Sequence, residues 1–125
     1  MAKLFISVAA LAGMFAVMLG AFGAHALKNT LDDYAMGVFE TAVQYHFYHA
    51  FALLAVGIIA LSQADSVLLK TSGWLFIVGL VLFSGSLYTL SFSGARWLGA
   101  ITPLGGLAFI AGWGCLAAAS WKSLG

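Results

Sequence analysis

Histidine, carboxylate and tyrosine side chains are concentrated in one short stretch of an otherwise apolar chain. Residues 40–49, Glu-Thr-Ala-Val-Gln-Tyr-His-Phe-Tyr-His, contain one of four acidic residues, two of three histidines and two of four tyrosines. Imidazole and carboxylate groups exchange protons near neutral pH, ligate metal ions and hydrogen-bond polar ligands. We therefore expect a functional site of this chain to begin in this stretch.

Polar residues in other apolar segments are predicted to join this stretch in one layer. At 100° per residue, Glu40, Gln44 and Tyr48 share one helical strip, with Tyr45 and His49 on the next. Antiparallel membrane helices would bring further polar residues to the same depth, within the outer third of the bilayer. The predicted ligand-binding residues are His25, Glu40, Gln44, Tyr45, His49, Ser84, Ser86, Tyr88 and Thr102. They predict a polar pocket near the outer leaflet that binds a small molecule, a lipid headgroup or a proton, as in a small carrier or accessory subunit.

Two other interpretations of the layer stay open. Hydroxyl, amide and imidazole groups pair across membrane helices at ~0.6–2 kcal/mol each, so the layer can be purely structural. The weaker alternative is a metal site of His25, His46, His49 and Glu40, because residues three apart on a helix can converge on one ion. Against a structural role alone, ionisable groups inside a membrane are expensive and usually mark function.

The elements that must position these residues are four membrane-spanning helices. The chain of 125 residues is 63% hydrophobic and 7% charged, with a mean hydropathy of +1.06, far from the composition of a soluble domain. Apolar runs predict helices over about 4–27, 31–62, 73–92 and 99–121, each near the ~20 residues that cross a bilayer. The short connections predict an all-α up-down four-helix bundle, and residues 1–125 form one domain.

Helix ends and packing surfaces can also be assigned. Thr30 is the expected cap of the second helix, whose first third would be an interfacial segment before the spanning part from about residue 43. Val67 to Lys70 would form one interfacial turn before the third helix, and Thr102 would cap the fourth. The residues predicted to pack helices closely are Gly13, Gly20, Gly23, Gly85, Pro103, Gly105 and Gly106. Gly/Ala faces of this kind also suit contact with a second copy or with another membrane protein, in a structural or assembly role.

Composition and motifs disfavour several classes of protein. A net charge of +1 gives no basic stripe, so nucleic acid is excluded as a partner. No nucleophile lies in a recognisable setting and no loop is built to hold phosphate, so we expect no enzyme, no catalytic residue and no cofactor. Cys115 lies in an apolar run and behaves as a small hydrophobic residue.

Four motifs in order support a family resemblance over nearly the whole chain. They are GAFGAHAL at 20–27, YHFYHAFALL at 45–54, FSGSLY at 83–88 and TPLGG at 102–106. With them the chain resembles the YgdD/YwdK-like family of small bacterial inner-membrane proteins, which is itself similar to animal transmembrane protein 256. The resemblance implies a four-helix membrane protein and supplies no substrate. The family motif positions that it implies are His25, Tyr45, His49, Ser84, Ser86, Tyr88, Thr102 and Pro103, whereas His46 stands where other members often carry an amide.

Charge and resemblance together predict a multi-pass protein of the inner (plasma) membrane, with the lipid bilayer as its first partner. Three lysines, Lys3, Lys70 and Lys122, fall on the face that bears both termini, against Lys28 and Arg96 on the other. Positive charge favours the cytoplasmic side, so we expect both termini in the cytoplasm.

Overall fold

The computed structural model describes residues 1–124, and the regular secondary structure of those residues is helical. The first helix is α1, Ala2–Phe22, continued by the π-helical segment η1, Gly23–Leu27. The second is α2, Asp33–Ala60. The third is α3, Val67–Gly79, continued by the π-helical η2, Leu80–Ser84, and by α4, Gly85–Ser93. A 3₁₀ turn, η3 (Arg96–Ala100), leads into α5, Thr102–Leu124.

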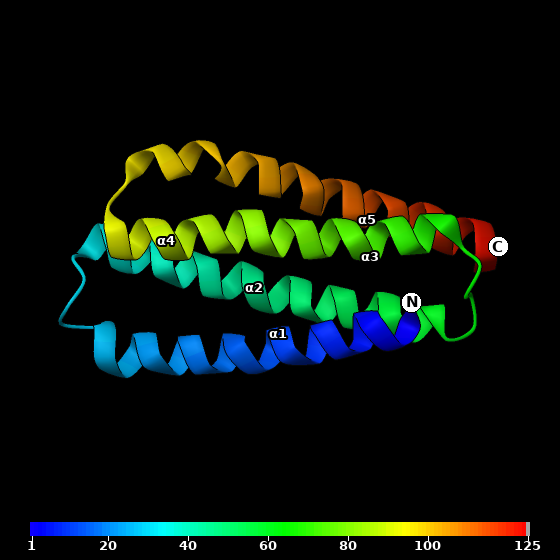
Figure 1. Cartoon of the computed structure of the whole chain (residues 1–125), viewed down its shortest axis with the longest axis horizontal. Helices are drawn as coiled ribbons and strands as arrows, with labels where there is room; N and C mark the ends of the chain where they lie inside the picture. Colours follow the sequence, from blue (N-terminus) through cyan, green and yellow to red (C-terminus); the bar gives the residue numbers. More distant parts are fainter. Residues whose placement is uncertain (125) are drawn as a thin grey trace.

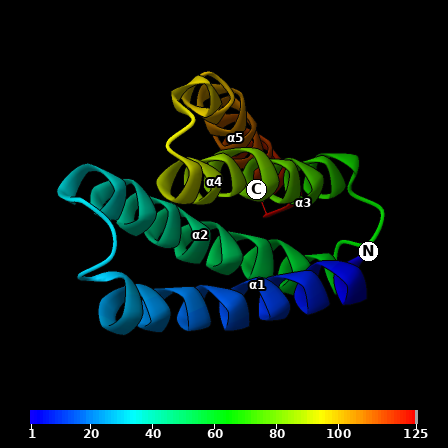
Figure 2. The same ribbon diagram turned by 60° about the vertical axis from the view of Figure 1, so that its left-hand side comes forward.

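Four helical units, residues 2–27, 33–60, 67–93 and 96–122, are long and apolar enough to cross a membrane. Consecutive units run antiparallel, and both chain ends lie at the same end of the molecule (Figure 1). This confirms the predicted all-α architecture of four membrane-spanning helices. α1 packs along α2, α3 packs along α5, and α2 also contacts α3, η2 and α4. α1 and α5 therefore lie on opposite sides of the central pair (Figures 1 and 2).

The ends of α2 and α3 differ from the sequence prediction for a local reason. The cap of α2 is Asp32, whose carboxylate accepts a hydrogen bond from the Ala35 amide at 2.8 Å, whereas the Thr30 hydroxyl bonds back to Ala26. α2 then runs unbroken through its 28 residues, about 42 Å, so the first third that was predicted to be interfacial and the spanning part form one helix. Ser66 caps α3 by accepting from the Leu69 amide, and the helix begins at Val67 rather than at residue 73.

The connection into α5 depends on one glycine. Gly94 has φ 69° and ends α4 in the left-handed conformation, with its amide bonded to the Leu90 carbonyl at 2.8 Å. The chain then turns through η3, and Pro103 lies in the first turn of α5, where a missing amide proton costs no hydrogen bond. The Thr102 hydroxyl bonds to Ser86 and Leu98 instead of capping the helix.

Two apolar clusters stabilise opposite ends of the molecule. The larger cluster includes Phe5 of α1, Leu53 and Val56 of α2, and Phe76 of α3, all fully buried. A smaller cluster around Ala42, Leu87, Leu90 and Leu98 lies near the connections 28–32 and 94–95. Polar side chains lie between the two clusters.

Candidate functional site

His49 is the most connected polar side chain of the spanning helices. It is 5% exposed, and its Nδ1 lies 2.8 Å from the Tyr45 carbonyl oxygen one turn earlier on α2. Trp113 of α5 donates its indole Nε1–H to His49 Nε2 at 3.1 Å. Because an indole nitrogen only donates, His49 must carry its proton on Nδ1 and accept at Nε2. Both imidazole nitrogens are thus engaged, and the ring is also stacked on Phe109 with centroids 3.5 Å apart.

His46 points to a different helix. Its Nδ1 lies 2.9 Å from the hydroxyl of Tyr88 on α4, and the Tyr88 ring packs edge-on against Phe39. His46, which is absent from the predicted ligand-binding residues, therefore belongs to the layer through a direct bond between α2 and α4. His46 and His49 diverge toward α4 and α5, which separates the two imidazoles of the metal alternative.

Serine and threonine hydroxyls complete the layer. The Ser84 hydroxyl donates to the Ala42 carbonyl of α2 at 3.2 Å, and the Ser86 and Thr102 hydroxyls are 2.7 Å apart across α4 and α5. Ser72, which the sequence analysis did not select, donates to the Gly112 carbonyl at 2.7 Å. Among the described residues, no buried side-chain polar atom lacks a hydrogen-bond partner. The buried side chains of the layer are therefore bonded to other protein groups.

Three of the predicted site residues lie outside this layer. His25, Glu40 and Gln44 are exposed, and Glu40 and Gln44 line a separate groove of about 320 Å³ where α2 passes the end of α1. No group of three or more His, Cys, Asp or Glu side chains able to hold a metal ion occurs in the described part of the chain. The set His25, His46, His49 and Glu40 is thus dispersed over the molecule.

The depth of the layer also differs from the prediction. α2 runs from Asp33 to Ala60, so His46 and His49 lie close to the middle of the helix and not in its outer third. The hydrogen bonds of Ser84, Ser86 and Tyr88 lie from there toward the end that carries the connections 28–32 and 94–95. The layer reaches from mid-membrane toward one surface.

Beside the layer, a groove opens on the lipid-facing side between α2 and α5. Its volume is about 490 Å³, within the range of small-molecule sites. The groove is lined by Tyr45, Tyr48, His49, Phe83, Gly106, Phe109, Ile110 and Trp113. The stacked pair His49 and Phe109 is its most buried part, while Tyr45, Tyr48 and Trp113 are 36%, 53% and 47% exposed. Sequence analysis selected Tyr45 and His49 as site residues but missed Phe109 and Trp113, although an indole N–H inside an apolar run needs an acceptor.

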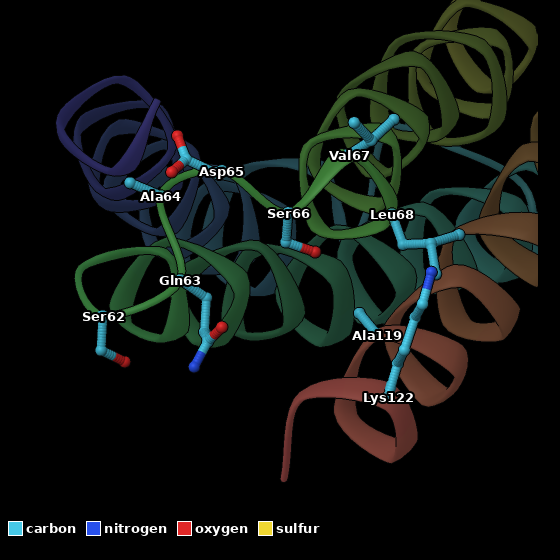
Figure 3. Close-up of a pocket in the computed structure, with 9 residues that line it drawn as sticks. All are labelled: Ser62, Gln63, Ala64, Asp65, Ser66, Val67, Leu68, Ala119 and Lys122. Atoms are coloured by element: carbon cyan, nitrogen blue, oxygen red, sulfur yellow. The ribbon is translucent and has the colours of Figure 1, made fainter.

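A larger hollow, about 570 Å³, lies at the end of the molecule that bears both termini. Residues 62–66 of the α2–α3 connection line it together with Val67 and Leu68 of α3 and with Ala119 and Lys122 of α5. The Lys122 side chain reaches across it toward Leu68 (Figure 3). It belongs to the loop surface and shares no residue with the polar layer.

Glycines set the spacing of the helices that carry the site. A Cβ at Gly23 would strike the Phe39 ring, and one at Gly105 would strike the Phe83 backbone, so both allow close approach. A Cβ at Gly20 would lie 3.4 Å from Val43, an ordinary contact, and one at Gly106 would lie 3.9 Å from Phe83. Gly13 and Gly85 face open space. Four tightly packed glycines were missed by the sequence analysis: Gly57, Gly73, Gly79 and Gly112.

The fold and the site define a class: a multi-pass membrane protein of four helices, with a hydrogen-bonded polar layer and a groove open to lipid. The chain belongs to the family described as "Protein of unknown function (DUF423)", which matches residues 19–106. The UPF0382 membrane protein YwdK of Bacillus subtilis is 50% identical over 124 residues, covering 98% of this chain and 99% of that protein.

Similar relatives occur in other bacteria. The UPF0382 membrane protein SH2409 of Staphylococcus haemolyticus is 49% identical over 123 residues, covering 98% of this chain and 99% of its own length. A UPF0382 membrane protein of Haemophilus influenzae is 42% identical over 119 residues, covering 95% of this chain and 94% of its own. No solved structure matches the chain. The resemblance inferred from the four motifs is thereby confirmed.

Proposed function

We propose that this protein is a non-enzymatic membrane protein that binds a lipophilic molecule bearing a carbonyl oxygen, in the groove between α2 and α5. The observation that carries the proposal is the pair of tyrosine hydroxyls in the groove. Within residues 40–49 the side chains that form hydrogen bonds are Thr41, His46 and His49. In the described part of the chain, the Tyr45 and Tyr48 hydroxyls therefore have no partner.

A hydroxyl without a partner is costly where water is absent. Taking a hydroxyl from water into an apolar medium without a hydrogen bond costs a few kcal/mol. Tyr45 lies about 18 Å along α2 from Asp33, and its side chain points back toward the start of the helix. This depth is below the headgroups, where the available acceptors are carbonyl oxygens of esters or of ring ketones. A carbonyl on the bound molecule would satisfy the Tyr45 hydroxyl.

The rest of the groove suits the apolar part of such a molecule. Aromatic rings form its walls: Tyr45 packs on Phe83 with centroids 4.7 Å apart, and Phe109 is stacked on His49. One hydrogen bond to His49 fixes the orientation of Trp113, so this wall is preorganised. An acyl chain or an isoprenoid tail would lie along Ile110, which is 70% exposed.

The proposed role requires no reaction at the protein. The Ser84 hydroxyl donates to a backbone carbonyl, the Ser86 and Thr102 hydroxyls bond to each other, and the two histidines of α2 bond to Tyr88 and Trp113. Such groups hold a scaffold together and leave no activated nucleophile or free base.

The test is retention of a native lipophile by the purified protein. Protein extracted in mild detergent is analysed by native mass spectrometry, and the bound molecule is identified by its mass after extraction, which distinguishes an ester lipid from a quinone. Tyr45→Phe should weaken retention about 2- to 10-fold, the usual effect of one hydrogen bond. Ile110→Trp, which fills the groove and leaves every hydrogen bond in place, should weaken it further.

The matched control is Tyr34→Phe. Tyr34 is 53% exposed, as Tyr48 is, but it lies outside the groove beneath Arg96, 4.7 Å from the guanidinium carbon. This variant should retain the same molecule as the unchanged protein. Equal retention by all four proteins, or a bound molecule lacking a carbonyl, would refute the proposal.

The alternative is a structural partner for other membrane helices, and one observation favours it. The polar layer is fully paired, as expected of groups that only hold helices together. Ile110→Trp distinguishes the two roles. It should abolish a function that depends on the groove, and it should leave a structural role of the paired layer intact.

A further inference from the structure

The exposed side of α2 carries a regular stripe outside the polar layer, of which Tyr48 also lines the groove between α2 and α5 and Gln44 the separate groove beside α1. Thr41, Gln44, Tyr48, Phe51, Ala55 and Ile58 follow one another at alternating spacings of three and four residues. All are exposed except Thr41, which is half-buried; Phe51 is 66% exposed and Ile58 53%. This heptad-like spacing is the pattern of a helix that pairs with another at a shallow left-handed crossing angle.

Besides the Tyr48 hydroxyl, the stripe contains one more polar group without a partner in the described part of the chain, the Gln44 amide. The Gln44 side chain is exposed and makes no hydrogen bond within the described part of the chain. It lies about 16 Å along α2 from Asp33 at ~1.5 Å per residue. If α2 is centred on a hydrocarbon core of ~30 Å, this places the Gln44 backbone about 10 Å below the membrane surface. An amide there loses its water and requires another partner.

We propose that the α2 stripe pairs with the same stripe of a second copy, so that the protein is a parallel homodimer centred on Gln44. Both copies have the same orientation in a membrane, so a twofold axis along the membrane normal brings each stripe residue to its counterpart at equal depth. An amide offers both donor and acceptor, so two Gln44 side chains satisfy each other. A single polar residue in an apolar helix seam is also a known determinant of register and oligomeric state.

The rest of the stripe fits a self-complementary contact. Large Tyr48 and Phe51 side chains alternate with the small Ala55, which gives the projections and recesses that interlocking helices need. Glu40 lies beside the stripe and one turn nearer the membrane surface, so its carboxylate reaches headgroup water. Two copies can therefore meet without burying two like charges.

The test measures dimerisation in bilayers. Single-molecule photobleaching or energy transfer between labelled copies, over a range of protein-to-lipid ratios, gives the dissociation constant. Gln44→Leu preserves the approximate size and removes the amide, and it should weaken dimerisation about 3- to 30-fold. Gln63→Leu, which removes an amide from the α2–α3 connection, should leave the dissociation constant unchanged.

A second measurement maps the contact. In a Cys115→Ala background, Phe51→Cys and Ala55→Cys should form disulfide-linked dimers on mild oxidation. Leu11→Cys, on the lipid-facing side of α1 and 53% exposed, should not. A wild-type protein that stays monomeric at all protein-to-lipid ratios, or cross-linking through Leu11→Cys without Phe51→Cys, would overturn the proposal. Tyr48 belongs to both the stripe and the groove. The variants that test dimerisation, at Gln44, Phe51 and Ala55, lie outside the groove, and those that test the groove, at Tyr45 and Ile110, lie outside the stripe, so failure of one proposal is distinguishable from failure of the other.

Discussion

The bond between Trp113 and His49 is predicted to contribute measurably to the stability of the fold. His49→Phe keeps a flat ring stacked on Phe109 but removes the acceptor of the Trp113 indole at 3.1 Å. The His49 bond to Tyr45 lies within α2, so the interaction between helices that is lost is the one to Trp113. Hydrogen bonds between membrane helices contribute ~0.6–2 kcal/mol. We expect a coupling free energy in this range between His49→Phe and Trp113→Phe.

The assay is a double-mutant cycle. The free energy of unfolding of the unchanged protein, both single variants and the double variant is measured by denaturation in mixed micelles, followed by circular dichroism. Combining His49→Phe with Ser86→Ala serves as the control, because Ser86 bonds to Thr102 and not to His49. That pair should be additive within ~0.5 kcal/mol. A coupling below ~0.3 kcal/mol for His49 and Trp113 would contradict the assignment of this bond as a stabilising link between α2 and α5.

Three further predictions concern the scaffold. Gly105→Ala should destabilise the protein by about 1–3 kcal/mol, because the new Cβ meets the Phe83 backbone, whereas Gly85→Ala faces open space and should change unfolding by less than ~1 kcal/mol. Asp32→Ala removes the α2 cap and should cost ~0.5–2 kcal/mol in the same denaturation assay, with Asp32→Asn recovering most of the loss. A topology reporter fused after Gly125 should read cytoplasmic, and an extracytoplasmic signal would reverse the predicted orientation.

The architecture could be predicted from the sequence because the length of an apolar run itself determines whether the run can cross the membrane as a helix. Backbone groups in lipid must be bonded within the segment, so four long apolar runs dictate four helices. The exact ends of the helices could not be predicted as well, since Thr30 and Asp32 are both good N-cap residues. The structure selects Asp32, which leaves Thr30 bonded to the preceding turn at Ala26.

The residues of the polar layer were largely predicted, but their partners were not. The hydrogen-bond partner of each side chain depends on the rotation of its helix about the helix axis. The prediction assumed a uniform rotation of 100° per residue. The π-helical segment η2, Leu80–Ser84, has more residues per turn, which shifts the phase of Ser86 and Tyr88 relative to the preceding helix. Ser86 consequently meets Thr102 on α5, while Tyr88 meets His46 on α2.

The groove was missed because it is built from apolar side chains. The prediction rests on polar residues, whereas Phe109 and Ile110 have the side chains of ordinary lipid-facing or core residues of α5. Only the relative placement of α2 and α5 shows that these side chains and Tyr45 line one depression. The signal available in the sequence was Trp113, an indole in the middle of a spanning segment, where a donor must find a buried acceptor.

The most direct test of the groove is photolabelling in a bilayer. A lipid with a photoactivatable diazirine on its acyl chain is incorporated into vesicles with the protein, and labelled positions are mapped by mass spectrometry. The proposed function predicts labelling concentrated at Tyr45, Ile110 and Trp113, and its loss in Ile110→Trp. Labelling spread evenly over lipid-facing residues such as Leu11 and Val81, 53% and 65% exposed, would contradict it.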